Sequence, residues 1–194
     1  MSKIAIIHHS GSGKTKMLAE AVAEGVRGVV GAEVIELAID SKKIVDGRYK
    51  DEAVFAALAT ADAIIFGSPT YMGMVSGQFK TFADATAGIW FGQGWKNKLA
   101  AGFTTSGSPS GDKQGTLQYL VTLASQHGMI WVSLGEMNGI YAGHPEATAI
   151  NRLGSFTGVM SQVAPTPEGR PTEGDFATGR ALGRRVAELA AKLS

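Results

Sequence analysis

Short, uninterrupted apolar runs alternate along this chain with longer segments in which apolar residues recur every three or four positions. Two such runs are Ile4-Ala5-Ile6-Ile7 and Ala63-Ile64-Ile65-Phe66, and the first is followed by an amphipathic segment at residues 14–30. A strand with no polar face must be covered on both sides, and the helices that connect parallel strands supply that cover. The alternation therefore predicts a parallel α/β sheet with helices on both faces.

The pattern is that of a single domain over residues 1–194, a length that one hydrophobic core can serve. Strands are expected over residues 3–9, 32–38, 61–67, 98–105 and 129–134. Helices are expected over residues 14–30, 52–60, 76–88, 116–127 and 171–193. The segments 88–97 and 135–170 fit neither kind of element. We expect them to be insertions near a site or an interface, because long segments without regular structure usually carry function.

Composition excludes several classes of protein. There is no cysteine, which rules out disulfides, a thiolate nucleophile and zinc–cysteine sites. A net charge of +1 gives no sign of nucleic-acid binding, and no spacing of histidines and carboxylates indicates a metal site. No run reaches the roughly 20 apolar residues of a membrane span. The first apolar run is too short for a secretory signal, so we expect a cytoplasmic protein. Charged residues make up only 18%, which favours a homo-oligomer with additional buried surface.

The sequence His8-His9-Ser10-Gly11-Ser12-Gly13-Lys14-Thr15 joins the first expected strand to the first expected helix. Backbone N–H groups and the helix dipole make such a junction a binding site for anions. Hydroxyl groups of Ser10, Ser12 and Thr15 add neutral donors, and Lys14 can add a full charge. We therefore expect a phosphate group to bind here. An ordinary turn with a serine or threonine cap is the alternative.

The identity of the phosphate ligand follows from how well known motifs fit this loop. Gly13-Lys14-Thr15 ends like the P-loop of ATP- and GTP-binding proteins, but that motif needs a glycine at position 8, which is histidine. The dinucleotide fingerprint fails at its third glycine, which falls on Lys16. A loop rich in neutral donors suits the terminal phosphate of FMN. FMN is therefore the favoured ligand, with nucleotides as the remaining alternative.

Two further loops support this interpretation. In a doubly wound sheet with the flavodoxin-like strand order 2-1-3-4-5, the loops after strands one, three and four meet at one edge, where ligands bind. These loops, at residues 10–15, 68–73 and 106–111, are rich in small polar residues. Glycines at 73, 107 and 111 allow backbone amides to approach a flat ring closely. The three loops together favour a site for the whole of FMN.

Several pieces of the chain, from the third expected strand onward, also carry a family resemblance. The matching pieces are Ala63-Ile64-Ile65-Phe66-Gly67-Ser68-Pro69-Thr70, then Gly73, Ser76-Gly77-Gln78-Phe79-Lys80-Thr81-Phe82-Ala83-Asp84, Lys98-Leu99-Ala100 and Thr122-Leu123-Ala124-Ser125-Gln126-His127-Gly128-Met129. With these pieces the chain resembles the flavodoxin-like FMN proteins, most closely the WrbA-like NAD(P)H:quinone oxidoreductases. The similarity runs from the first strand to about Val132 and resumes loosely near residues 153–158 and in the last helix.

The resemblance implies an oxidoreductase that passes two electrons from NADH or NADPH through FMN to a quinone or similar acceptor. It implies a homo-oligomer, a dimer or a tetramer, in which the long segment before the last helix helps to build the site across subunits. His127 matches the family's flavin-facing histidine, and Trp90 matches its active-site tryptophan. The cofactor-binding positions carried over are Ser10, Ser12, Gly13, Lys14, Thr15, Pro69, Thr70, Tyr71, Met72, Gly73, Thr105, Ser106, Gly107 and Ser108.

Some features leave alternatives open. The family's Pro-Thr-Arg-Phe-Gly is Pro-Thr-Tyr-Met-Gly here, which removes a cation beside the cofactor. A flavodoxin-type one-electron carrier, a nucleotide-dependent phosphotransferase and a non-enzymatic FMN-binding protein are the rival functions. Trp90 and Trp95 have an alternative role as core or interface anchors. Asp112 and Lys113 are interpreted as a helix cap and a surface charge.

Overall fold

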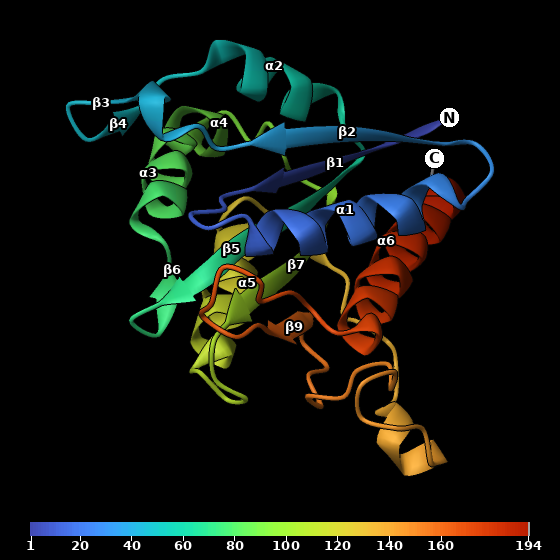
Figure 1. Cartoon of the computed structure of the whole chain (residues 1–194). Coiled ribbons are helices and arrows are strands. Elements are labelled where there is room, and N and C mark those ends of the chain that lie inside the picture. Colours follow the sequence, from blue (N-terminus) through green and yellow to red (C-terminus); the bar gives the residue numbers. More distant parts are fainter. Residues whose placement is uncertain (194) are drawn as a thin grey trace.

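A parallel β-sheet forms the centre of the protein, whose structure is a computed structural model describing residues 1–193 (Figure 1). Its strands are β1 (Ser2–His8), β2 (Ala32–Ala38), β5 (Ala63–Tyr71), β7 (Leu99–Ser106) and β8 (Ile130–Trp131), in the order β2-β1-β5-β7-β8. This order is the expected 2-1-3-4-5, so the prediction of a flavodoxin-like doubly wound sheet is confirmed. The carboxyl ends of β1, β5 and β7 lie at the same edge, where the ligand loops were expected.

Helices cover both faces of the sheet. Helices α1 (Lys14–Arg27) and α6 (Glu173–Leu193) lie side by side on one face (Figure 1). Helices α2 (Glu52–Thr60), α3 (Gly77–Ala85) and α5 (Lys113–Gln126) contribute to the core of the other face. Alternate residues of β1 enter the two cores: Ile4 and Ile6 pack with α1 and α6, whereas Ala5 and Ile7 pack on the opposite side. This two-sided burial explains the all-apolar strands.

Helices α1 and α6 approach each other closely because glycines line their contact. A Cβ atom added at Gly25 would lie 2.0 Å from the carbonyl oxygen of Arg180, and one at Gly183 would lie 2.0 Å from that of Val22. Each glycine thus allows the backbone of the other helix to come near. The pairing fixes the start of α6 relative to the loop from which α1 begins.

The fifth strand position is divided between two segments, which differs from the single strand expected over residues 129–134. β8 pairs with Leu99 and Ala100 at the start of β7, whereas β9 (Val159–Gln162) pairs with the last four residues, Phe103–Ser106. The chain between them leaves the sheet, includes the short helix η2 (Gly139–Ala142) and projects away from the core (Figure 1). Leu134 N–H donates to Phe156 O (3.1 Å), which closes the base of this excursion. The expected insertion at 135–170 therefore contains a sheet strand.

The projecting segment is attached to the rest of the protein by buried polar contacts. Arg152 donates from Nε to Asp175 Oδ1 at 2.9 Å, and both side chains are almost fully buried. The carboxylate of Asp175 also accepts from Ser161 Oγ at 3.0 Å, linking α6 to β9. Asn151 donates from Nδ2 to Glu136 O (2.9 Å), and its backbone N–H donates to Thr178 Oγ1 (2.8 Å). These contacts order a segment that has little apolar periodicity.

Smaller elements complete the chain. Residues 40–51, expected to be a polar connection, contain η1 (Ser41–Lys43) and the hairpin of β3 (Ile44–Val45) and β4 (Arg48–Tyr49). Its Tyr49 is buried edge-on against Phe55 and Phe82. The segment 88–97 begins within α4 (Ala87–Phe91) and includes Trp95, which is buried in the core. Within residues 1–193, no helix combines the length and apolarity that crossing a membrane requires.

Candidate functional site

The three expected loops converge at the carboxyl edge of the sheet. A cavity of about 240 Å³ opens between them. Its lining residues are Ser12, Lys14, Thr15, Pro69, Thr70, Tyr71, Thr105, Ser106, Gly107, Val163 and Pro165. Ser10, Gly13, Met72, Gly73 and Ser108, also expected at the site, lie in the same loops but outside this lining. Val163 and Pro165 come from the segment after β9 and lie within residues 135–170, which were expected near a site or an interface, although these two residues were not singled out in the sequence.

The first loop leaves the start of α1 free for an anion. Gly13 is the N-cap residue, with a φ of 83° and no side chain to cap the helix, and the first turn of α1 contains no acidic residue. Ser10 Oγ accepts from the backbone N–H of Lys16 at 3.2 Å, which holds that hydroxyl over the loop. Amides at a helix N-terminus, together with nearby hydroxyls, suit a phosphate. The chemistry of these donors therefore fits the FMN phosphate.

The second loop differs in form from the expected loop at 68–73. Ser68, Pro69 and Thr70 belong to β5, which continues to Tyr71 and turns back into β6 (Met74–Val75). The turn residues Met72 and Gly73 have φ values of 48° and 80°. A two-residue hairpin turn with positive φ at both positions matches the natural twist of antiparallel strands. Its effect is to carry Tyr71 over the first loop, where a Cβ atom at Gly11 would lie 2.7 Å from the Tyr71 hydroxyl.

Buried hydroxyl groups connect the three loops beneath the cavity. Thr15 Oγ1 and Thr105 Oγ1 are 2.9 Å apart, and Thr70 Oγ1 lies 2.8 Å from Thr104 Oγ1 and 2.7 Å from Thr116 Oγ1. Each threonine has a hydrogen-bonding partner, so the cluster carries little desolvation penalty. The floor of the cavity is therefore uncharged and held rigidly.

A histidine links the first loop to the second. His9 Nδ1 is 2.8 Å from Ser76 Oγ, and the backbone N–H of Ser76 donates to Ser68 Oγ at 3.0 Å. Ser76 also caps α3 by accepting from Phe79 N–H. Burial lowers the pKa of His9, which favours its neutral form. No role for His9 was predicted from the sequence, in which only its position directly before Ser10 sets it apart.

The third loop is organised around a buried lysine, which corrects the interpretation of Lys113 as a surface charge. Its side chain is fully buried. Lys113 Nζ donates to Ser106 Oγ (2.9 Å), Ser108 O (2.6 Å) and Pro109 O (3.0 Å). Burial lowers the pKa of Lys113 to about 8. Asp112 stands at the N-cap position, as expected, but it has a φ of 53° and its side chain makes no capping hydrogen bond. A cation in the first turn of a helix is repelled by the positive end of the helix dipole. This unusual position was the one feature of the sequence that could have indicated a special role for Lys113.

Trp90 and His127 lie together, but away from these loops. His127 follows the last residue of α5, a helix about 20 Å long that begins at Lys113 beside the third loop. Next to His127, the carbonyl of Gly128 accepts from Asn97 N–H (3.0 Å) near the start of β7. His127 and Trp90 both line a separate cavity of about 280 Å³. Within one chain, the structure does not bring these two residues to the cofactor loops.

His127 makes contacts typical of a packed residue. It is buried, with Nε2 2.8 Å from Thr86 Oγ1 and its ring centroid 4.4 Å from that of Trp95. Burial lowers the pKa of His127. Trp95 is a core residue, as one of the two interpretations of the tryptophans anticipated. Trp90, by contrast, is 44% exposed, and its neighbour Phe91 is 85% exposed.

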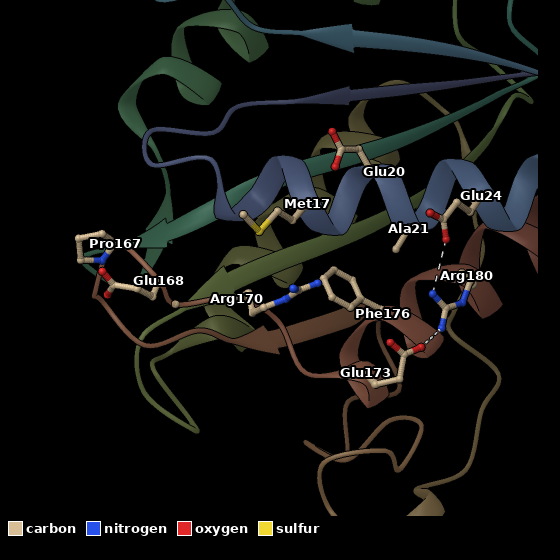
Figure 2. Close-up of a pocket in the computed structure, with 11 residues that line it drawn as sticks. Met17, Glu20, Ala21, Glu24, Pro167, Glu168, Arg170, Glu173, Phe176 and Arg180 are labelled. Atoms are coloured by element: carbon tan, nitrogen blue, oxygen red, sulfur yellow. Dashed lines mark hydrogen bonds and ion pairs between the residues drawn. The ribbon is translucent and has the colours of Figure 1, made fainter.

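A larger cavity, of about 530 Å³, lies between α1 and the start of α6 (Figure 2). Its rim carries Glu20, Glu24, Glu173 and Arg180, and Arg180 pairs with Glu24 and Glu173. None of the three loops contributes its small polar residues there. This cavity differs from the cofactor cavity in two ways. Charged side chains on its rim are paired with one another, and its lining includes no helix N-terminus that could bind an anion.

The strand order, the uncapped helix start after β1 and the two further loops at the same edge define a flavodoxin-like protein with a site for a phosphorylated ligand. The family described as NADPH-dependent FMN reductase matches residues 2–139. The chain belongs to this family.

Similar proteins cover the whole chain. It is 41% identical to "Flavodoxin FldP" of Pseudomonas aeruginosa, covering 100% of this chain and 99% of the relative. It is 37% identical to an "NAD(P)H dehydrogenase (quinone)" of Archaeoglobus fulgidus, covering 100% of both. Among solved structures, a flavodoxin, WrbA-like protein from Agrobacterium tumefaciens has 41% identity and a TM-score of 0.76 over 100% of both chains. The WrbA-type resemblance is confirmed.

Proposed function

We propose that the protein is an FMN-dependent oxidoreductase that passes two electrons from NADH or NADPH to a quinone or similar small acceptor. The convergence of the three loops on one cavity, beside the uncapped start of α1, carries this proposal. The relatives named NAD(P)H dehydrogenase (quinone) support it, since they match over nearly their full lengths. We further propose that residues 1–194 act as one domain, with 88–97 and 135–170 serving the site or an interface.

The residues divide by the part of FMN that they would hold. Ser10, Ser12 and Thr15, with the first amides of α1, would bind the phosphate. The residues from Pro69 to Gly73 and from Thr105 to Ser108 would border the ring. When bound, FMN supplies the chemistry by accepting a hydride from the nicotinamide and delivering two electrons onward. The protein would orient the two reactants in turn and limit the access of water.

We propose that His127 and Trp90 act in an oligomer, a dimer or a tetramer. Because they lie far from the loops of their own chain, they would approach the cofactor of a neighbouring copy. The exposed rings of Trp90 and Phe91 beside their cavity suit burial between subunits. His127 would then donate a hydrogen bond or a proton to the reduced acceptor. We propose the cytoplasm as its location, where NADH and NADPH are available.

A flavodoxin-type electron carrier is the second candidate function. It is favoured by the 41% identity to a protein named flavodoxin. Carriers of that kind tend to be strongly acidic, and the net charge of +1 is unlike that. A non-enzymatic FMN-binding protein is a third candidate that shares the same site.

The visible spectrum of the purified protein tests the cofactor, and anaerobic titration with NADH and NADPH tests the activity. We expect a flavin spectrum that is bleached within the time of mixing and restored by a quinone. A flavin spectrum without direct reduction by either nicotinamide would favour the carrier. Reduction of the flavin without transfer of electrons to quinones would favour the non-enzymatic FMN-binding protein. A colourless protein that binds ATP with magnesium would overturn the FMN site.

A further inference from the structure

Lys14 was expected to place its charge near a phosphate, but its ammonium group is engaged elsewhere. We infer that Lys14 is a positioning residue that holds residues 163–170, here called the strap, as a wall of the cofactor cavity, and that it is not a ligand of the phosphate. The inference rests on the proposed binding of FMN in that cavity. It concerns how the cofactor is retained, which is a separate matter from the reaction.

The ammonium group of Lys14 holds the strap by two hydrogen bonds, which are here called the clasp. Lys14 Nζ donates to Thr166 O at 2.6 Å and to Gly169 O at 2.8 Å. The strap bends around it, since Gly169 N–H donates back to Thr166 O at 3.1 Å. A Cβ atom at Gly169 would lie 2.1 Å from Ala164 O and 3.0 Å from Lys14 Nζ, so the bend leaves no room for a side chain there. The strap is thus shaped to present carbonyl oxygens to one cation.

The strap forms part of the cavity and also lies along α1. Val163 N–H donates to Ser106 O at 2.9 Å, and Val163 and Pro165 line the cavity beside Gly107. Figure 2 shows Pro167, Glu168 and Arg170 continuing past the start of α1. Arg170 then lies over the ring of Phe176, with its Cζ atom 5.6 Å from the centroid. Residues 164–168 are exposed, so little apolar burial holds the middle of the strap in place.

The position of Lys14 in the helix is also informative. It is the first residue of α1, directly after Gly13. A lysine there is opposed by the positive end of the helix dipole. The two carbonyl groups of the strap offset that cost with charge-assisted hydrogen bonds. Two of the three N–H donors of the ammonium are used by these carbonyls. Holding the strap and binding the phosphate predict different effects when the ammonium is removed, so the two roles can be separated by experiment.

Comparison of FMN with riboflavin, which lacks the phosphate, separates the two roles. Dissociation constants of both are measured with refolding-competent apoprotein of the wild type, Lys14→Met and Lys14→Arg. If Lys14 holds the strap, Lys14→Met weakens FMN and riboflavin by the same factor, about tenfold, and Lys14→Arg restores most of the affinity. A loss confined to FMN would identify a phosphate ligand and overturn the inference. Unchanged affinity for both flavins would overturn it as well.

Lys16 provides the matched control. It lies two residues further along α1, and its ammonium is 3.8 Å from a carboxylate oxygen of Glu20, with 65% of its side chain exposed. Lys16→Met removes the same charge from the same helix end without touching the strap. We expect it to change neither dissociation constant by more than about twofold. An equal loss of affinity in both variants would show that net charge is responsible and would contradict the clasp.

A second measurement needs no flavin. The bond after Glu168 is exposed to a glutamate-specific protease, and cleavage there is followed by mass spectrometry in folded apoprotein. Release of the strap in Lys14→Met should speed this cleavage about tenfold over the wild type and over Lys16→Met. An unchanged rate, with circular dichroism confirming the fold, would overturn the clasp. If the wild type bound neither flavin, the proposed function would fail, whereas this measurement would still report on the clasp.

Discussion

Thr15 and Thr105 join the first and third loops through a buried hydrogen bond between their hydroxyl groups, with 2.9 Å between the oxygens. Thr15 belongs to the first turn of α1, and Thr105 lies near the end of β7. Ser106, the next residue of β7, is held by the buried Lys113. The two loops are therefore fixed to each other below the cavity before any ligand enters, which reduces the ordering that binding has to supply.

Breaking this bond should cost stability. Thr105→Val keeps the shape of the side chain but leaves the Thr15 hydroxyl buried without that partner, so we expect unfolding in urea to require about 1–3 kcal/mol less free energy. The double variant with Thr15→Val should cost less than the sum of the single variants, because it removes both polar groups. Strict additivity of the two losses would show that the hydroxyls do not interact.

Negative charge in the first loop should expel the phosphate. Ser10→Asp places a carboxylate beside the start of α1, and repulsion between like charges should raise the FMN dissociation constant by at least about tenfold. Fluorescence titration of apoprotein measures this. Ser10→Asn, which is neutral, is the control and should retain most of the affinity, and riboflavin should bind both variants alike. Unchanged FMN binding by Ser10→Asp would place the phosphate elsewhere.

The buried Lys113 should make stability depend on pH. Its folded-state pKa of about 8 lies below the ordinary value of 10.5, so between these values the unfolded chain binds a proton that the folded chain does not. The stability of the wild type relative to Lys113→Met should therefore rise with pH across this window and fall as the pH is lowered through it. Urea unfolding at several pH values gives the difference. A difference that is constant across the window would show that the lysine titrates normally.

The proposed role of His127 predicts a loss of quinone turnover without a loss of FMN affinity. His127→Gln can keep a hydrogen bond to Thr86, so we expect the FMN dissociation constant to stay within about twofold of the wild type while quinone turnover falls roughly a hundredfold. Stopped-flow measurement of the two half-reactions should assign the loss to reoxidation by the quinone. Sedimentation velocity identifies the oligomer in which this is measured. Full turnover in His127→Gln would leave the residue with a packing role only.

A side chain at the glycines of the contact between α1 and α6 should destabilise the protein. Gly183→Ala places a methyl group 2.0 Å from Val22 O, a backbone atom that can move only with its helix. We expect a loss of about 1–3 kcal/mol in unfolding free energy. Gly88→Ala is the control in α4, where the added carbon would meet no atom outside its own helix within 4 Å, and it should be neutral or stabilising. Equal stability of the two variants would contradict the close approach of the helices.

Sequence alone predicted the parts of the fold that depend on periodicity. All-apolar strands such as Ile4–Ile7 and their intervening helices were sufficient to predict a parallel sheet covered on both faces, and the order of its strands followed from the flavodoxin-like fold. The divided fifth strand could not be predicted, because Ile130–Trp131 and Val159–Gln162 are each too short to show a period. The two lysines could not be assigned for another reason. Lys113 was interpreted as a surface charge, and Lys14 was expected only to add charge near a phosphate. A lysine in sequence does not reveal which carbonyl groups will surround it after folding.

The division of the fifth strand position has a consequence for how the protein behaves at high concentration. A sheet ends in a row of unpaired backbone groups, and a long, flat row invites strands from other molecules to add. Here that border consists of two short pieces, β8 and β9, separated by a segment that turns away from the sheet. An incoming strand finds no continuous register to extend. The interruption between β8 and β9 therefore leaves no continuous edge to which a strand of another molecule could add.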